Sequence, residues 1–174
     1  MKVVLAIVTS LDGKSTKGFK PPKLWASKED QLHFQSLISK NNVIVMGKNT
    51  YTVSKDIIKL SKNKLRIVMA RDINEFKGAV VSNQLEFSSE SPKQLIKRLT
   101  KQGFKQMLLV SGPKLNSAFL KAGLVNELWI TLEPNIFGAG IGLVDSEKLD
   151  VKLKLLSSKK LNAQGTLLLK YQVI

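Results

Sequence analysis

The segment VVLAIVTSLDGKST, residues 3–16, shows a pattern that recurs along the chain. Six apolar residues, rich in the β-branched types that favour strands, lead into small polar residues, an Asp-Gly pair and a lysine. Asp12-Gly13 is a common turn dipeptide, so a strand followed by an ordinary turn accounts for these residues. A ligand site at the carboxyl end of a strand accounts for them equally well, and the remaining sequence has to separate the two interpretations.

The chain has 174 residues, which is enough for a substantial core, and no linker, repeat or low-complexity tract divides residues 1–174. We therefore expect a single domain. The first apolar run is too short for a membrane helix and lacks a cleavage pattern, so we expect a cytoplasmic protein with no signal peptide and no membrane contact. The sequence has no cysteine and only one histidine, His33, which argues against a thiolate nucleophile and against a metal site.

The chain carries a formal net charge of +15, from 28 Lys and Arg residues against 13 Asp and Glu residues. Such a charge attracts polyanions, including phosphorylated metabolites. The cations are dispersed, and few aromatic residues are available to stack on bases. We therefore expect a small-molecule partner, and a basic nucleic-acid-binding module is the alternative outside enzymes.

Apolar runs alternate with helical patterns along the chain. Strands are expected at residues 3–8, 42–47, 64–70, 78–82, 106–112 and 126–134, followed by an antiparallel hairpin of residues 152–161 and 166–174. Helices are expected at residues 27–40, 90–103 and 113–123. This order predicts an α/β fold of three layers, with a central and mostly parallel sheet, helices on both faces and an antiparallel hairpin at the end.

The first predicted helix begins with Ser27 three residues before Asp30, the spacing of a capping box. Phe34, Leu37 and Ile38 are expected to form its apolar face.

Ligands in open parallel sheets bind beyond the carboxyl ends of the strands. The residues expected at those ends are Ser10–Lys14, Gly47–Thr50, Arg71, Ser111–Lys114 and Glu133. The second and fourth of these segments each combine a glycine, a hydroxyl and a cation at a strand-to-helix junction, where backbone N–H groups favour phosphate. With Arg71 between them, they indicate a ligand that carries several phosphates, such as a dinucleotide. The sequence contains neither GxGxxG nor GxxxxGK[ST], so it lacks the two common phosphate-binding fingerprints.

The chain resembles the dihydrofolate reductase superfamily, and within it the reductase domain of the riboflavin-pathway deaminase-reductases. The resemblance covers nearly the whole length and rests on the order and spacing of several segments. These are SLDGK (10–14), WASKEDQLHF (25–34), VMGKNTY (45–51), VSGPKLNSAFLKAGLVNEL (110–128) and EPNIFGAG (133–140). The resemblance implies a dihydrofolate-reductase-like fold and an oxidoreductase that uses NADPH as hydride donor.

The resemblance also implies which residues contact NADPH. The family's usual Gly-Arg-x-Thr is present as Gly47-Lys48-Asn49-Thr50, so that Lys48 would face the 2′-phosphate or the pyrophosphate and Thr50 a pyrophosphate oxygen. Ser111-Gly112 matches a glycine pair beside the cofactor that is often joined by a cis peptide bond. The other cofactor contacts that we expect are Ala6, Ser10, Arg71, Pro113 and Lys114.

Two substrates are compatible with the resemblance. In the riboflavin branch the enzyme reduces 5-amino-6-(5-phosphoribosylamino)uracil, and the lysine of SLDGK, here Lys14, contacts the substrate. Residues 51–66 lack the Asp-Asn-Pro-x-Leu-x-x-Arg motif of that branch. In the folate branch, a carboxylate of the first helix supports protonation of the pterin of dihydrofolate, and Asp30 matches this position with Thr131 beside it. The tail of folate would then have to meet Lys64 or Arg66.

Asp30 is equally explained as a helix cap, and both interpretations stay open at this point. We expect Lys14 and Asp30 to be catalytic, and Trp25, Asp30, Phe34, Thr131 and Glu133 to contact the substrate. Either reaction transfers hydride to the carbon of a C=N bond. The riboflavin-type reaction is preferred, because SLDGK and EPNIFGAG resemble that branch more closely. A homodimer and a monomer are both compatible with the resemblance.

Overall fold

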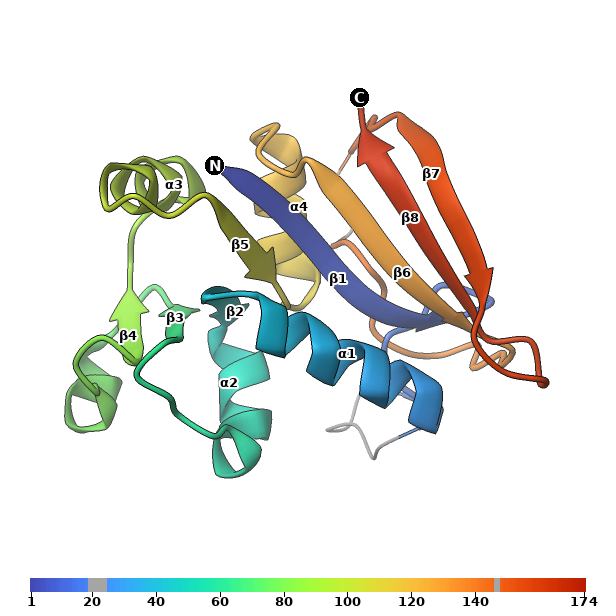
Figure 1. Ribbon diagram of the computed structural model, residues 1–174, viewed down its shortest axis with the longest axis horizontal. Coiled ribbons are helices and arrows are strands. Elements are labelled where there is room, and N and C mark those ends of the chain that lie inside the picture. Colours follow the sequence, from blue (N-terminus) through green and yellow to red (C-terminus); the bar gives the residue numbers. More distant parts are fainter. Residues whose placement is uncertain (19–24, 146–147) are drawn as a thin grey trace.

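The computed structural model describes residues 1–18, 25–145 and 148–174, which form one eight-stranded sheet with helices on both faces (Figure 1). The strands are β1 (Lys2–Ser10), β2 (Val43–Gly47), β3 (Leu65–Met69), β4 (Leu85–Ser88), β5 (Gln106–Leu109), β6 (Glu127–Glu133), β7 (Leu153–Lys160) and β8 (Leu167–Val173). The helices are α1 (Lys28–Lys40), α2 (Lys48–Ser54), α3 (Pro92–Lys101) and α4 (Pro113–Lys121), with the short 3-10 helices η1 (Lys55–Ile57) and η2 (Asn74–Ala79). Within these residues, no helix is both long and apolar enough to cross a membrane.

The strands follow one another across the sheet in the order β4-β3-β2-β5-β1-β6-β8-β7. The first six of these run parallel, and β8 and β7 form an antiparallel hairpin at the far edge. This arrangement confirms the predicted fold class and the terminal hairpin. Strand β1 lies between β5 and β6, so its carboxyl end at Ser10 is in the middle of the edge where ligands were expected.

Two apolar cores hold the layers together, one on each face of the sheet. Leu95 and Leu99 of α3 and Phe119 of α4 pack on one face. Leu37 of α1 and Tyr51 of α2 pack on the other. The central strands β1, β2, β3 and β5 contribute alternate residues to the two cores, as the period of a strand requires.

The prediction of a strand at residues 78–82 is wrong. This region contains the end of η2, followed by Val80, whose side chain is 54% exposed, and the strand forms later, at β4. A turn containing Asn83, with φ of 58°, separates the two, and the backbone of Val81 bridges to Leu85. The pair Val80-Val81 has strand propensity, but Leu85 and Ser88 are the residues that become buried beside β3.

The capping box predicted for α1 forms only in part. The Ser27 side chain accepts a hydrogen bond from the backbone N of Asp30 at 3.2 Å, which confirms Ser27 as the N-cap. The reciprocal contact is absent, because the backbone N of Ser27 donates instead to Oε1 of Glu133 at 2.8 Å. The predicted apolar face is also narrower than expected, since Leu37 is buried whereas Phe34 is exposed.

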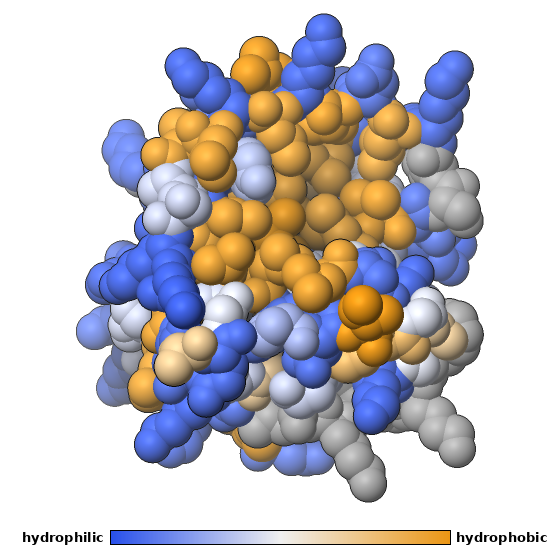
Figure 2. All heavy atoms as spheres, turned by 90° about the vertical axis from the view of Figure 1, so that its right-hand side faces the viewer, coloured by the Kyte–Doolittle hydropathy of each residue, from blue (hydrophilic) through white to orange (hydrophobic). Residues whose placement is uncertain are grey.

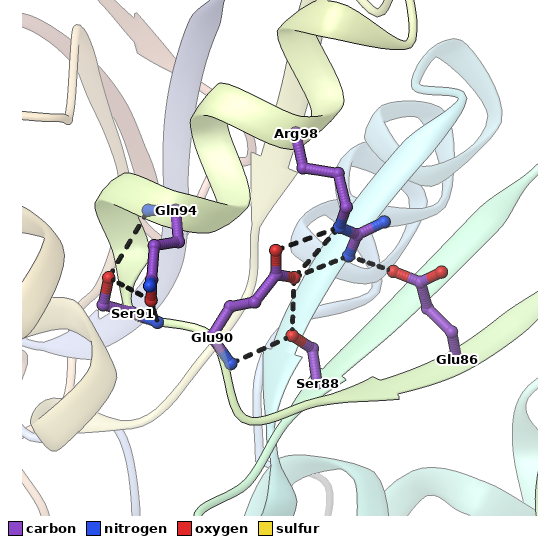
Figure 3. A network of polar contacts seen from close by, with 6 residues as sticks. All are labelled: Glu86, Ser88, Glu90, Ser91, Gln94 and Arg98. Carbon is purple, nitrogen blue, oxygen red and sulfur yellow. Dashed lines mark hydrogen bonds and ion pairs between the residues drawn. The ribbon is translucent and has the colours of Figure 1, made fainter.

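Helix α3 is fastened to β4 by the side chain of Arg98 (Figure 3). The Arg98 guanidinium donates to the carboxylate of Glu90 through Nε and Nη2, at 2.9–3.1 Å, and to Oε1 of Glu86 at 2.5 Å. Oε2 of Glu90 also accepts a hydrogen bond from the Ser88 hydroxyl at 2.8 Å. Charge-assisted bonds of this kind are stronger than neutral ones, so this network fixes the edge of the sheet to the helix layer.

Replacing Arg98 with Met should lower the free energy of unfolding at pH 7 by about 1–3 kcal/mol. Hydrogen bonds from Arg98 are the main cause that lowers the pKa of Glu90 from its ordinary value of 4.5. The contribution is therefore present above that value and is lost as the pH falls through the lowered pKa of the folded state. Urea unfolding of both proteins between pH 7 and pH 3 measures this difference.

Lys97→Met is the matched control, because Lys97 is exposed on the same helix and has no part in this network. It should leave the free energy of unfolding nearly unchanged at every pH. A loss in Arg98→Met that is equally large at pH 3 would contradict the assigned role of the Glu90 carboxylate.

Candidate functional site

The predicted site residues lie along one edge of the sheet. Strands β3, β2, β5, β1 and β6 are parallel neighbours in that order, so their carboxyl ends open on the same side. Ser10 pairs directly with Glu133, and Val8 pairs with Thr131. Adjacent strands are about 4.8 Å apart, so the groups that follow these strands can contact a single elongated ligand.

The segment Ser10–Lys14, at the end of β1, forms a tight turn closed by its own side chains. The Ser10 hydroxyl donates to Oδ1 of Asp12 at 2.6 Å and accepts from the backbone N of Lys14 at 2.9 Å. The Asp12 carboxylate also accepts from the backbone N of Phe137 at 3.1 Å and of Gly138 at 2.7 Å. These hydrogen bonds, with that from Ser10 the largest cause, lower the pKa of Asp12 to about 2. Asp12 thus joins the loop after β1 to the loop after β6.

Further contacts align these two loops along their length. The backbone N of Ser15 donates to the Ile141 carbonyl at 2.7 Å, and the backbone N of Gly18 donates to the Ala139 carbonyl at 3.0 Å. At Gly140 the loops are so close that a Cβ atom would lie 2.1 Å from the Thr16 carbonyl oxygen. This position therefore excludes any side chain, which explains one glycine of the predicted close-approach segment 133–140.

Trp25 and Lys14 lie beside this pair of loops. The indole Nε1 of Trp25 donates to the Ser15 carbonyl at 3.3 Å, and its ring meets the Phe137 ring edge-on at 4.8 Å. The backbone of Lys14 bridges to Gly142, and its side chain is half-buried. In the described part of the chain, no carboxylate lies within ion-pair distance of the Lys14 ammonium.

Glu133, at the end of β6, is 3% exposed, and both of its carboxylate oxygens have partners. Oε1 accepts from the backbone N of Ser27 at 2.8 Å, and Oε2 accepts from the Thr166 hydroxyl at 2.6 Å. Glu133 thus connects the start of α1 to the end of the turn that precedes β8. Its predicted contact with substrate stays a prediction. In this structure both carboxylate oxygens accept hydrogen bonds from groups of the protein.

Asp30 differs from Glu133, although both carboxylates are buried on the same face of the sheet. Burial raises the pKa of Asp30, the hydrogen bond from Thr131 lowers it, and the negative charge of Glu133 raises it further, so that the net shift is upward. The backbone N of Ser27 donates to Glu133, so it does not donate to the Asp30 side chain as it would in a complete capping box. Asp30 is therefore a buried carboxyl group that retains a proton more readily than an ordinary aspartate.

A pocket of about 420 Å³ opens beside Glu133. Its lining residues are Trp25, Ser27, Glu29, Glu133, Pro134, Asn135, Asn162, Gln164 and Thr166. They come from the start of α1, the end of β6 and the turn of the β7–β8 hairpin. A second hollow of similar size lies at the opposite edge of the sheet, around Asn42, Asn63 and Asn83. Lys64, which the folate interpretation placed at the tail of the substrate, lines this hollow and is thus far from the pocket beside Glu133.

The segment predicted to bind phosphate after β2 lies partly at the surface. Lys48 and Asn49 are exposed, whereas Gly47 and Thr50 are half-buried. The Lys48 ammonium forms an ion pair with Glu75 of η2 and lies 5.7 Å from the centre of the Phe76 ring.

The second predicted phosphate segment follows β5. The Ser111 hydroxyl donates to Oδ1 of Asn116 at 2.6 Å, and the buried Asn116 donates to the Leu143 carbonyl at 2.8 Å. Gly112 is the N-cap of α4, with open space where a Cβ would be, and Pro113 begins the helix. The Ser111-Gly112 bond is trans, as are all peptide bonds of the described residues. Lys114 and Arg71 are both exposed, and Ala6 is buried in β1.

Several residues of the site had no recognisable signal in the sequence. Thr166 and Asn116 became important only because the fold brings distant segments together. Ser27 was predicted as a helix cap, but its contact with Glu133 was not. Asn162 lies in the predicted hairpin turn, yet its contact with Glu29 at 3.1 Å spans 133 residues. Within the described residues, no group of three or more His, Cys, Asp or Glu side chains could hold a metal ion.

One protein family, two curated proteins and several solved structures are similar to this chain. The model of the RibD C-terminal domain matches residues 1–167. The chain is 22% identical over 171 residues to the uncharacterized protein YyaP of Bacillus subtilis, covering 91% of this chain and 88% of that protein. It is 33% identical over 100 residues to the riboflavin biosynthesis protein RibD of Buchnera aphidicola, covering 55% of this chain and 26% of that protein.

A solved structure from Thermotoga maritima has the same fold. It is described as a diaminohydroxyphosphoribosylaminopyrimidine deaminase/5-amino-6-(5-phosphoribosylamino)uracil reductase. The TM-score is 0.77 at 17% identity, and the match covers 99% of this chain and 56% of that one.

Gly140→Ala should loosen the paired loops, because the added methyl group cannot fit beside the Thr16 carbonyl. We expect a cost of at least about 1 kcal/mol, which lowers the melting temperature by about 2–4 °C. Gly78→Ala is the control, since Gly78 has open space around its Cβ position. Equal melting temperatures for Gly140→Ala and the unaltered protein, measured by circular dichroism, would contradict the close approach.

Proposed function

Because the chain belongs to the RibD C-terminal domain family, we propose that it is an NADPH-dependent reductase of 5-amino-6-(5-phosphoribosylamino)uracil or a closely similar ribosylamino-pyrimidine. The observation that carries this proposal is that the segments predicted to contact cofactor and substrate lie along one sheet edge, with a pocket beside Glu133 at its end. A ligand that follows this edge would extend from the end of β3 to the end of β6.

The charges along the edge suit a dinucleotide with three phosphates. Lys48, Arg71 and Lys114 are exposed at the ends of β2 and β3 and at the start of α4. Gly112 leaves open space beside its backbone, which allows a pyrophosphate to approach. These residues would hold NADPH, which when bound supplies the hydride. Lys48 would exchange its ion pair with Glu75 for a phosphate.

The chain's own groups orient the substrate and supply the proton. Lys14 and Trp25 lie beside the paired loops near β1, where they would position the pyrimidine and its sugar phosphate. Asp30, with its raised pKa, would give a proton to the nitrogen of the C=N bond while the carbon receives hydride. Glu133 holds the start of α1, and hence Asp30, in place.

Dihydrofolate is a second candidate substrate, favoured by the environment of Asp30. A buried carboxyl group on the first helix, hydrogen-bonded to a threonine on the adjacent strand, suits protonation of a pterin nitrogen. The comparisons favour the pyrimidine, so this candidate rests on the Asp30–Thr131 pair alone.

The test is to assay both substrates side by side with NADPH, following the loss of the reduced-nicotinamide absorbance. We expect turnover of the ribosylamino-pyrimidine and none of dihydrofolate. With the active substrate, Asp30→Asn should lower kcat by about 100- to 10,000-fold and remove the decline of activity at high pH, since asparagine keeps the hydrogen bond but gives no proton.

Asp56→Asn is the control for this variant, because Asp56 is exposed in η1, and it should leave kcat and the pH profile unchanged. Turnover of dihydrofolate alone would assign the chain to the second candidate. Turnover of neither substrate, in a protein that binds NADPH, would contradict both substrate assignments and leave the cofactor assignment standing.

Lys48→Glu should raise the KM for NADPH at least tenfold and change the KM for NADH much less, because only NADPH carries the 2′-phosphate that Lys48 would face. Lys55→Glu alters an exposed lysine at the far end of α2 and should change neither value. Steady-state kinetics with both cofactors measures the ratio. An equal rise for the two cofactors would contradict the 2′-phosphate assignment.

A further inference from the structure

The carboxylate of Glu75 neutralises the lysine that is predicted to face the 2′-phosphate of NADPH. Glu75 lies in η2, the short helix after β3, and its Oε1 forms an ion pair with the ammonium of Lys48 at the start of α2. In the described part of the chain, no other carboxylate lies within ion-pair distance of Lys48. Glu75 is therefore the group that a phosphate has to displace from this ammonium.

The aromatic residue that follows Glu75 fixes η2 to its neighbours. The Phe76 ring stacks on the Phe87 ring of β4, with ring centres 4.5 Å apart and an interplanar angle of 4°. The Tyr51 ring of α2 meets these two rings edge-on, at 6.0 and 5.2 Å. Aromatic contacts of this kind stabilise a fixed arrangement beyond the area that they bury. The backbone that carries Glu75 is thus tied to the helix that carries Lys48.

The turn before Glu75 contributes further restraints. The backbone N of Phe76 donates to the Ile73 carbonyl at 3.1 Å, and the backbone N of Asn74 donates to Oδ1 of Asp72 at 2.9 Å. This turn follows directly after Arg71, the other cation predicted to contact a cofactor phosphate at this end of the sheet. The fold therefore places a negative charge where the cofactor's phosphate is expected.

A carboxylate beside Lys48 affects the two nicotinamide cofactors unequally. NADPH carries a phosphate at the 2′ position of its adenosine ribose, whereas NADH carries a hydroxyl there. The phosphate has to replace Glu75 at the Lys48 ammonium, and it then lies near a like charge, which opposes binding. The hydroxyl of NADH donates hydrogen bonds, and a carboxylate accepts them. The Glu75 side chain therefore penalises NADPH and leaves NADH unpenalised.

We propose that Glu75 is a specificity-determining residue, which lowers the affinity for NADPH relative to NADH by competing with the 2′-phosphate for Lys48. This inference rests on the proposed function, since it requires a nicotinamide dinucleotide along the sheet edge. The Lys48 and Glu75 side chains are 46% and 44% exposed, and ion pairs at such exposure are weak enough to exchange. Glu75 thus tunes the affinity for NADPH without closing the site.

Removal of the carboxylate leaves Lys48 in place. The Lys48 ammonium also lies 5.7 Å from the centre of the Phe76 ring, a cation–π contact that does not involve Glu75. Glu75→Gln should therefore release the ammonium from its ion pair while keeping it near the position where the phosphate would bind.

Lysines at the other edge of the sheet provide a comparison for Lys48. The strand order places β4, which follows η2, at one edge and β7 at the other. Figure 2 views the β7 side, where hydrophobic residues form a broad area with hydrophilic residues around it. Lys154 of β7 is exposed on this side, away from the predicted cofactor segments. It matches Lys48 in charge and exposure but not in position.

The test is to measure the dissociation constants of NADPH and NADH by fluorescence titration, for the unaltered protein and for Glu75→Gln. We expect the variant to bind NADPH about three- to tenfold more tightly and NADH no more tightly than the unaltered protein does. Asp56→Asn, which removes a negative charge from the exposed η1, is the matched control and should change neither constant.

Two further measurements isolate the 2′-phosphate and the lysine. Adenosine 2′,5′-bisphosphate should gain affinity in Glu75→Gln by the same factor as NADPH, and AMP, which lacks the 2′-phosphate, should gain none; calorimetric titration measures both. In a Lys48→Gln background, Glu75→Gln should lose most of its effect, because no ammonium is left to release. In a Lys154→Gln background the effect should persist in full.

Equal NADPH constants for Glu75→Gln and the unaltered protein would overturn the proposal. An equal gain for NADPH and NADH would do so too, as would a gain that survives in full without Lys48. NADPH binds in each of these cases, so the proposed function would stand. An unaltered protein that binds neither cofactor would overturn the proposed function and this inference together.

Discussion

The carboxylate of Glu133 is the contact on which the candidate site depends. It is buried at the end of β6, and its two oxygens accept hydrogen bonds from Ser27, the N-cap of α1, and from Thr166, just before β8. A buried carboxylate without such donors would be strongly destabilising, so the three segments constrain one another. The start of α1 is held in register with the sheet, and Asp30 is thereby fixed against Thr131.

This arrangement gives two neighbouring carboxyl groups different tasks. Glu133 receives both of its hydrogen bonds from groups of the protein, so its carboxylate connects the start of α1 to the turn before β8. Asp30 is buried near that negative charge, which favours the protonated form. The polar groups around Asp30 thus form a proton-holding site that is separate from the contacts that hold the fold.

The sequence predicted the fold class and the strand ends because both depend on local patterns. Apolar runs ending in Ser10, Gly47 and Ser111 follow from hydrophobic periodicity and turn residues. The role of Asp30 could not be decided in this way, because it depends on whether Ser27 donates to Asp30 or to Glu133, which is 106 residues away in sequence. The position of β4 was missed for a related reason: at an edge strand of four residues, contact with β3 outweighs the strand propensity of Val80.

The central position of β1 has a consequence for folding. Its first residues pair with β5, so that Lys2 lies beside Gln106, and its remaining length pairs with β6. During synthesis this apolar strand therefore has neither neighbour until roughly 100 further residues have been made, a separation typical of slowly folding topologies. In that interval the apolar segment VVLAIV is exposed and prone to aggregate with other nascent chains. Efficient production of this protein should depend on chaperones or low temperature more than on the stability of the finished fold.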